Sequence, residues 1–178
     1  TMRPPNYAID WDAARRALSP RTRAIVLNSP HNPTGMILTG GDIRELATLL
    51  EHTDAVVVSD EAYEHIVFDG ARHEGLSRHP AIAERAVVIG SFAKTFHTTG
   101  WKIGWTAAPR ALSAEVQSIH QWVTFAVNGA IQHAYAEFLQ RDPTCSTVSP
   151  FYQGKRDLFL SLMAGSRFRP LPCRGTFF

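Results

Sequence analysis

Polar side chains that could do chemistry follow three apolar segments of the chain. Asn32 follows the first segment, Asp60 and Tyr63 follow the second, and Ser91 and Lys94 follow the third. Each has a plain alternative explanation: an asparagine before proline is usually a turn residue, an aspartate after a strand is usually a helix cap, and a lysine usually lies in solvent. Together, however, an amine, a carboxylate, a phenol, an amide and a hydroxyl indicate a site for a reactive, charged cofactor.

Lys94 carries the strongest chemical indication. It lies between an apolar segment and a Gly-Trp segment, in the sequence Gly-Ser-Phe-Ala-Lys-Thr-Phe at 90–96. A partly buried lysine of this kind can form a Schiff base with a carbonyl cofactor. Asp60 could hold a pyridinium nitrogen in its protonated form, which would make the ring of such a cofactor an electron sink.

Four further side chains could bind the remaining polar groups of this cofactor. Asn32 and Tyr63 would supply hydrogen-bond donors for a phenolate oxygen. Ser91 would supply a hydroxyl and Lys102 a cation for a phosphate. His97, close to Lys94, either lines the substrate site or is a surface or supporting residue. Trp101 and Trp105 could form a wall of the cofactor pocket, although packing behind the pocket is the preferred interpretation.

Two other kinds of site are excluded by spacing. A phosphate-binding P-loop needs glycine at two positions where this chain has Val88 and Ala93. The histidines near the middle of the chain, in His73-Glu74 and at His79, lack the His-Glu-x-x-His spacing of a zinc protease. We therefore expect no metal site.

The candidate site residues must be positioned by a scaffold of short strands and helices. Apolar runs at 24–27, 55–58, 86–89 and 103–107 predict four strands, and continuous apolar runs are typical of strands buried on both faces. Helical spacing predicts helices over 12–18 after the N-cap Asp10, from the Thr39–Asp42 capping box onward, over 113–140 with a break near 128–129, and over 149–164. This alternation predicts an α/β fold with a mainly parallel central sheet and helices on both faces. In such folds ligands bind at the carboxyl ends of the strands, where the polar residues lie.

Composition excludes several classes of partner. The chain has 178 residues, 44% of them hydrophobic, and a net charge of +2 with no run of basic residues, so we expect neither nucleic acid nor a membrane surface as a partner. No apolar run approaches the roughly 18 residues of a membrane span, and no apolar stretch of a signal peptide follows Thr1. Cys145 and Cys173 have no pairing pattern, which predicts free thiols in a reducing compartment.

Three motifs in this order resemble the signature of class I aminotransferases of fold type I, which depend on pyridoxal 5′-phosphate. They are Asn-Pro-Thr-Gly at 32–35, Ser-Asp-Glu-x-Tyr at 59–63, and Ser-Phe-x-Lys-Thr followed by Thr-Gly-Trp-Lys-x-Gly at 91–104. Flanking segments at 10–23 and 120–128 are similar to the branch that contains methionine, glutamine and kynurenine aminotransferases. The resemblance covers essentially the whole chain.

The resemblance implies a role for each matching residue. Lys94 would form the Schiff base and later carry the proton between the substrate α-carbon and the C4′ carbon of the cofactor. Asp60 would pair with the pyridine nitrogen, while Asn32 and Tyr63 would bind the 3′ oxygen. The phosphate would be bound by Ser91 and by Lys102, where many relatives have arginine. Lysine keeps the charge but loses the two-pronged geometry of arginine.

The resemblance also implies how the chain divides and what it lacks. Residues 1–148 would be part of a large cofactor-binding domain, and residues 149–178 a linking helix and the start of a small domain. Both ends look cut, and the family's further phosphate-binding turn, its ring-stacking aromatic residue and its carboxylate-binding arginine would lie outside this chain. We therefore expect the 178-residue chain alone to be catalytically inactive.

The function implied is transamination, from a methionine, glutamine or aromatic type of amino acid to a 2-oxo acid. A pyridoxal-phosphate-dependent C–S β-lyase of the same fold is the alternative, since it uses the same carbanion but a different leaving group. A non-catalytic cofactor-binding descendant is a third possibility, against which the intact set of site residues argues. The resemblance implies a homodimer when the protein is whole, and a cytoplasmic location.

Overall fold

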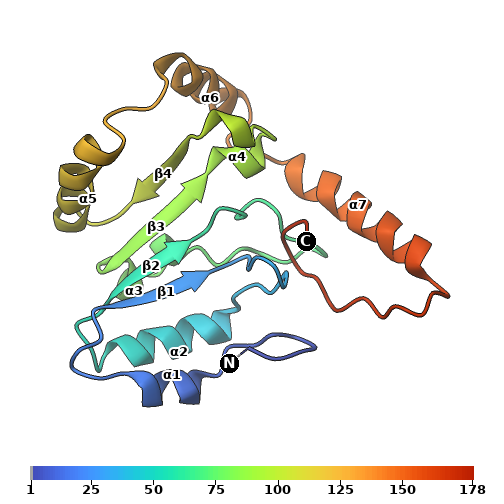
Figure 1. The fold of residues 1–178 in the computed structure, drawn as a ribbon, viewed down its shortest axis with the longest axis horizontal. Coiled ribbons are helices and arrows are strands. Elements are labelled where there is room, and N and C mark those ends of the chain that lie inside the picture. Colours follow the sequence, from blue (N-terminus) through green and yellow to red (C-terminus); the bar gives the residue numbers. More distant parts are fainter. Residues whose placement is uncertain (1) are drawn as a thin grey trace.

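The computed structural model describes residues 2–178, and its centre is a mixed four-stranded sheet (Figure 1). The strands lie in chain order, with β1 and β2 parallel, β2 and β3 parallel, and β4 antiparallel to β3. Their bounds are Ala24–Asn28 for β1, Val56–Asp60 for β2, Ala86–Ser91 for β3 and Gly104–Ala107 for β4. The predicted α/β fold with a mainly parallel sheet is thus confirmed, and all four predicted strands are present.

Seven α-helices and two short 3-10 helices surround the sheet within residues 2–178. The α-helices are α1 (Trp11–Ala17), α2 (Gly40–Leu50), α3 (Pro80–Ala83), α4 (Phe92–Thr95), α5 (Arg110–Val123), α6 (Gly129–Arg141) and α7 (Val148–Met163). The 3-10 helices are η1 (Leu76–Arg78) and η2 (Thr99–Trp101). The predicted break near 128–129 separates α5 from α6, with Asn128 as the N-cap of α6.

Two helix starts are formed by the residues that the sequence indicated. The side chain of Asp10 accepts a hydrogen bond from the backbone of Ala13 at the start of α1. At the start of α2, Thr39 and Asp42 exchange side-chain and backbone hydrogen bonds as a reciprocal capping box. Because these contacts satisfy amide groups that have no partner inside the helix, they fix where each helix begins.

The main core lies between one face of the sheet and helices α2 and α3. Four residues of α2 at helical spacing are buried, and they pack with alternate residues of β2 and β3. The buried members of this cluster are Leu38, Ile43, Leu46, Leu49, Leu50, Val57, Leu76, Ile82, Ala86 and Val88. On the opposite face, Val26 of β1 is 73% exposed.

The C-terminal segment returns to the carboxyl ends of the parallel strands. In Figure 1 the arrowheads of β1, β2 and β3 point the same way, and the chain end lies beyond them. Phe68 donates a backbone hydrogen bond to Arg174, and Thr176 donates one to Ile66. This short antiparallel pairing, centred on the bridge between Val67 and Gly175, places residues 174–178 beside the site.

Helix α7 is attached to the loop after β2 by polar contacts. Arg156 donates two hydrogen bonds of 2.6 Å to the carboxylate of Asp69, and Ser149 donates to the carbonyl of Val67. Gln153 accepts from the backbone of Asp69 at 2.8 Å. None of the helices within residues 2–178 has the length and apolar character that a membrane crossing requires. Cys145 and Cys173 are both free, as predicted.

Candidate functional site

Asn32 and Tyr63 meet at the carboxyl end of the sheet. The side-chain amide of Asn32 lies 3.4 Å from the hydroxyl of Tyr63, which is at the long end of the range for a hydrogen bond. Asn28, the last residue of β1, positions this pair because its side chain accepts from the backbone of Asn32 at 2.8 Å and donates to the carbonyl of Asp60 at 3.0 Å. The sequence did not single out Asn28, since its part depends on contacts across the sheet.

Asp60 ends β2 and lies opposite Ile89 of β3. One of its carboxylate oxygens accepts a hydrogen bond of 3.2 Å from the backbone of Ala62. Burial raises the pKa of Tyr63, the negative charge of Asp60 raises it further, and the hydrogen bond from Asn32 opposes both. The pKa of Tyr63 therefore depends on both Asp60 and Asn32. Such coupling suits a site that binds a charged ring.

Lys94 extends from the short helix α4, which follows β3 directly. Its amino nitrogen is 6.0 Å from the ring centre of Tyr63 and 6.0 Å from that of Phe177. Both distances are at the outer limit of a cation–π contact. The predicted pair of Lys94 and Tyr63 is thus brought together, and Phe177 joins it from the far end of the chain. Only the return of the C-terminal segment reveals this contact.

Ser91 and Lys102 lie on adjoining segments, although the structure shows no contact between them. Ser91 ends β3 and pairs with Gly104 of β4, two residues after Lys102. The hydroxyl of Ser91 does not cap α4. Lys102 is exposed and has a backbone φ of 55°, in the left-handed region, where it ends η2. The two residues therefore lie at the same edge of the site as α4, with Lys102 turned to solvent.

A tryptophan packs directly on the strand that leads to Lys94. A β-carbon added at Gly90 would lie 2.1 Å from the indole of Trp105, so only glycine fits there. Trp105 also packs against the main core, which supports the packing interpretation. Trp101 is exposed, and its ring centre is 5.8 Å from that of Tyr135.

A set of aromatic rings extends from Tyr63 toward α7. Tyr63 contacts Phe177 edge to face at 5.4 Å, and Phe177 stacks on Tyr152 at 5.3 Å. Tyr152 in turn stacks on His97 at 5.5 Å, and its hydroxyl is 3.1 Å from His97 Nδ1. These contacts join His97 to α7.

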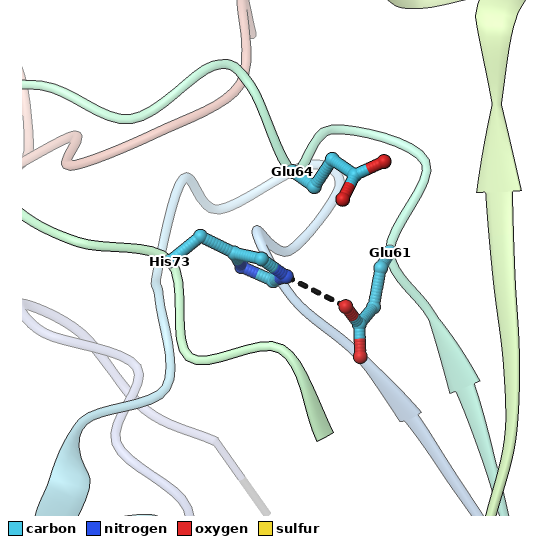
Figure 2. A group of neighbouring side chains, drawn as sticks. All are labelled: Glu61, Glu64 and His73. Atoms are coloured by element: carbon cyan, nitrogen blue, oxygen red, sulfur yellow. Dashed lines mark hydrogen bonds and ion pairs between the residues drawn. The ribbon is translucent and has the colours of Figure 1, made fainter. Parts of the chain in front are cut away.

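Three ionisable side chains lie together just behind the site. Figure 2 shows Glu61, Glu64 and His73, whose nearest nitrogen and oxygen atoms all lie within 4.8 Å of one another. His73 Nε2 is 2.7 Å from a carboxylate oxygen of Glu61. The pair is twelve residues apart, and no short motif marks it, so the sequence did not reveal it.

Comparison with known proteins places the chain in a family. The family model for "Aminotransferase class I and II" matches residues 1–178. The chain is 41% identical to the methionine aminotransferase of Escherichia coli K12 over 178 residues, which is 99% of this chain and 46% of that protein. It is 30% identical to human kynurenine–oxoglutarate transaminase 3, over 98% of this chain and 42% of that protein.

Solved structures agree. The chain superposes on the methionine aminotransferase of Escherichia coli with a TM-score of 0.95 at 40% identity, covering 98% of this chain and 47% of that one. For N-succinyldiaminopimelate aminotransferase of Mycobacterium tuberculosis the TM-score is 0.91 at 39% identity, covering 99% and 46%. The chain thus spans less than half the length of the relatives it matches. On the match of the whole chain, this protein belongs to the class I and II aminotransferase family.

Proposed function

We propose that the whole protein carrying this chain catalyses transamination, moving an amino group from an amino acid to a 2-oxo acid. The observation that carries the proposal is the meeting of Lys94, Tyr63 and Asn32 at the carboxyl ends of β1 and β3, with Asp60 at the end of β2 between them. These residue types, in a chain of this family, are the ones that a pyridoxal-phosphate enzyme needs.

The residues present fit pyridoxal 5′-phosphate, the cofactor of this family. An amine, a phenol paired with an amide, and a carboxylate from the adjoining strand match the aldehyde, the phenolic oxygen and the ring nitrogen of that molecule. When bound, the cofactor supplies an electron sink for a substrate carbanion. The chain's own residues must hold it, orient it and move protons.

We assign these roles to individual side chains. Lys94 would hold the cofactor through Nζ, and its amine would carry the proton that leaves the substrate α-carbon. Asp60 would pair with the ring nitrogen, and Asn32 and Tyr63 would bind the 3′ oxygen. Because the pKa of Tyr63 is raised by burial and by Asp60, its hydroxyl keeps its proton and acts as a donor.

Ser91 and Lys102 are proposed to bind the phosphate. Ser91 ends β3 and Lys102 lies two residues before Gly104, the first residue of β4. The pairing of Ser91 with Gly104 therefore holds the two backbones on neighbouring segments. The exposed Lys102 side chain can turn toward the phosphate dianion. Its charge should contribute more to phosphate binding than the hydroxyl of Ser91 does.

The substrate, the assembly and the location are also proposals. The relatives are named for methionine, kynurenine and N-succinyldiaminopimelate, and we propose methionine, glutamine or an aromatic amino acid as the amino donor. We further propose a cytoplasmic homodimer, with residues 1–148 in the large domain and 149–178 leading into the small one. The relatives compared above are all named as aminotransferases or transaminases, so they give no support to the C–S lyase alternative.

Titration of the cofactor-free whole protein with pyridoxal 5′-phosphate tests the proposal. We expect a visible absorption band from the bound cofactor, its loss on adding methionine, and its return on adding a 2-oxo acid. Lys94→Ala should show no such band, whereas Lys155→Ala, a change on the exposed side of α7, should behave as the unaltered protein. Release of ammonia and a 2-oxo acid without any need for an acceptor would instead indicate a lyase.

A further inference from the structure

Glu61 is a buried carboxylate with every oxygen occupied. Its side chain keeps 3% of its exposure and that of His73 keeps 7%. One oxygen accepts from the hydroxyl of Ser59 at 2.8 Å and from the backbone of Leu76 at 3.0 Å, and the other lies 2.7 Å from His73 Nε2. A buried charge is tolerated only when it is bonded in this way.

The charge state of Glu61 sets the direction of these bonds. Burial alone would raise the pKa of Glu61, but the hydrogen bonds from His73, Leu76 and Ser59 outweigh it and hold the pKa below its ordinary value. An ionised carboxylate can only accept, so His73 Nε2 is the donor. His73 Nδ1 is buried without a partner within the described residues, which leaves Glu61 as the one polar contact of this ring.

The position of Glu61 in the chain links it to the candidate site. The backbone of Glu61 donates to Ile89 of β3 at 2.8 Å, so it continues the ladder of β2 by one residue. Ser59 and Glu61 are bonded to each other on one face of the sheet, so Asp60 between them points to the other face. Fixing Glu61 behind the sheet therefore fixes the direction of Asp60 in front of it.

The same bonds close the loop that carries Tyr63. Tyr63 lies in a turn in which Glu64 donates to the carbonyl of Glu61 at 2.9 Å. The loop then returns so that His73 and Leu76 bind the Glu61 side chain. A β-carbon at Gly75 would lie 3.1 Å from the Glu61 carboxylate, so the backbone of the loop approaches this carboxylate closely at a position where a side chain would be tight.

From these contacts we propose that Glu61 and His73 form a buried latch, made of these two side chains, that positions Asp60 and Tyr63 against the cofactor ring. The inference rests on the proposed function. Glu61 lies on the face of the sheet opposite Asp60, and His73 is bonded to it, so neither side chain would contact the cofactor and both are positioning residues. The latch acts on the ring and its oxygen, and it leaves Ser91 and Lys102, which belong to other segments, unaffected.

The third side chain of the group in Figure 2 has no part in the latch. The Glu64 side chain makes no hydrogen bond with Glu61 or His73, and its only ion pair within residues 2–178 is with His65 at 3.7 Å. Burial raises the pKa of Glu64, and the charge of Glu61 adds to this effect. Glu64 therefore serves as a control, because its carboxylate lies within 4.8 Å of the pair but is not bonded to it.

Binding of two ligands by the cofactor-free whole protein separates positioning from general destabilisation. The dissociation constant of pyridoxal 5′-phosphate is measured by its absorption band, and that of inorganic phosphate by competition. In Glu61→Gln and in His73→Leu, we expect cofactor binding to weaken on the order of tenfold, as loss of a hydrogen bond to a charged group predicts. Phosphate binding should stay within about twofold, because no phosphate contact is removed.

Two further variants serve as controls. The amide nitrogen of glutamine can stand where His73 Nε2 does, so His73→Gln should restore cofactor affinity to within about threefold of the unaltered protein. Glu64→Gln should leave both constants unchanged. The double variant Glu61→Gln with His73→Leu should bind the cofactor no more weakly than either single variant does, because the two side chains act as a unit.

The outcomes distinguish this inference from the proposed function. If the unaltered protein gives no cofactor band, the proposed function is wrong. If it does, but Glu61→Gln and His73→Leu bind the cofactor as tightly as the unaltered protein, the latch is wrong. Equal weakening of phosphate and cofactor binding would also overturn the latch, since that pattern indicates a general loss of structure.

Discussion

The two halves of the chain, residues 1–89 and 90–178, differ in how they bury their apolar side chains. In the first half, α2 buries four apolar residues against the sheet, and Leu46 is 0% exposed. In the second half, α5 buries none and α7 buries only Val148. The exposed apolar residues of this half include Ile119, Trp122, Val123, Phe125, Phe151, Leu158, Phe159, Leu160 and Leu162.

The first half thus encloses its own core, whereas many apolar side chains of the second half are exposed in this chain. Contiguous exposed apolar surface of this kind is typical of interaction sites. Asn32, Asp60 and Tyr63 come from the first half, after strands β1 and β2. Ser91, Lys94 and Lys102 come from the second half, from the end of β3 and the segments that follow it. The second half contributes aromatic contacts through Tyr152 and Phe177. Four predictions test the comparison, in order of decreasing effect.

Removal of core volume should affect the two halves very differently. Leu46→Ala leaves a cavity in the main core, and we expect a loss of about 2–5 kcal/mol in the free energy of unfolding. Leu162→Ala removes the same atoms from a side chain that is 74% exposed, and the change should stay within about 0.5 kcal/mol. Denaturant unfolding of both variants measures the difference. Equal losses would mean that α7 has an extensive apolar partner in the whole protein.

A charge on α5 should weaken the proposed homodimer. Trp122 is 82% exposed in this chain, and Trp122→Glu would place a carboxylate in the apolar surface. We expect the dimer dissociation constant to rise at least about tenfold, because interface tryptophans often contribute about 2 kcal/mol or more. Sedimentation of the whole protein over a range of concentrations measures this. Gln117→Glu, an exposed change on the same helix, is the control, and an unchanged dimer would exclude this face as the interface.

Most of the fold was predictable because local patterns determine it. The apolar runs identified all four strands, and the Thr39–Asp42 capping box identified the start of α2. Parallel pairing of β2 and β3 then places the carboxyl ends of the two strands side by side, with Asp60 opposite Ile89. Asn32, Tyr63 and Lys94 were recognised from motifs, and the structure brings them together.

The rest of the site depends on contacts between distant parts of the chain. Glu61 was part of a motif, but its partner His73 lies twelve residues away with no recognisable spacing. Phe177 reaches Lys94 only because residues 174–176 pair with the loop after β2. Asn28 had only the composition of a turn to mark it, and its two bonds cross from β1 to β2 and to the following loop.

The capping box in the enclosed half should have a moderate effect. Thr39→Ala removes the hydroxyl that accepts from the backbone of Asp42 and donates to its carboxylate, which should cost about 1 kcal/mol in the free energy of unfolding. Ser77→Ala, at an exposed position of η1, should cost little. The comparison is made by denaturant unfolding. If the two variants were equally stable, the capping box would contribute nothing measurable.

The smallest effect is expected at the edge of the site. Asn32→Ala removes a hydrogen bond to Tyr63 that is 3.4 Å long, so the free energy of unfolding should change by less than about 1 kcal/mol. Because that bond lowers the pKa of Tyr63, its loss should raise the pKa of Tyr63 further above the ordinary value. Absorption titration of the phenol in the cofactor-free protein measures this. A pKa that falls instead would contradict the assigned direction of the bond.

The attachment point of the cofactor tests the central claim most directly. The chain contains three lysines, Lys94, Lys102 and Lys155. The whole protein is loaded with pyridoxal 5′-phosphate, reduced with borohydride to make the linkage permanent, digested, and mapped by peptide mass spectrometry. We predict the added pyridoxyl phosphate on the peptide that contains Lys94, with no stoichiometric label on those containing Lys102 or Lys155. Label at either of those two lysines, or none on Lys94, would contradict the assignment of this residue as the one that holds the cofactor.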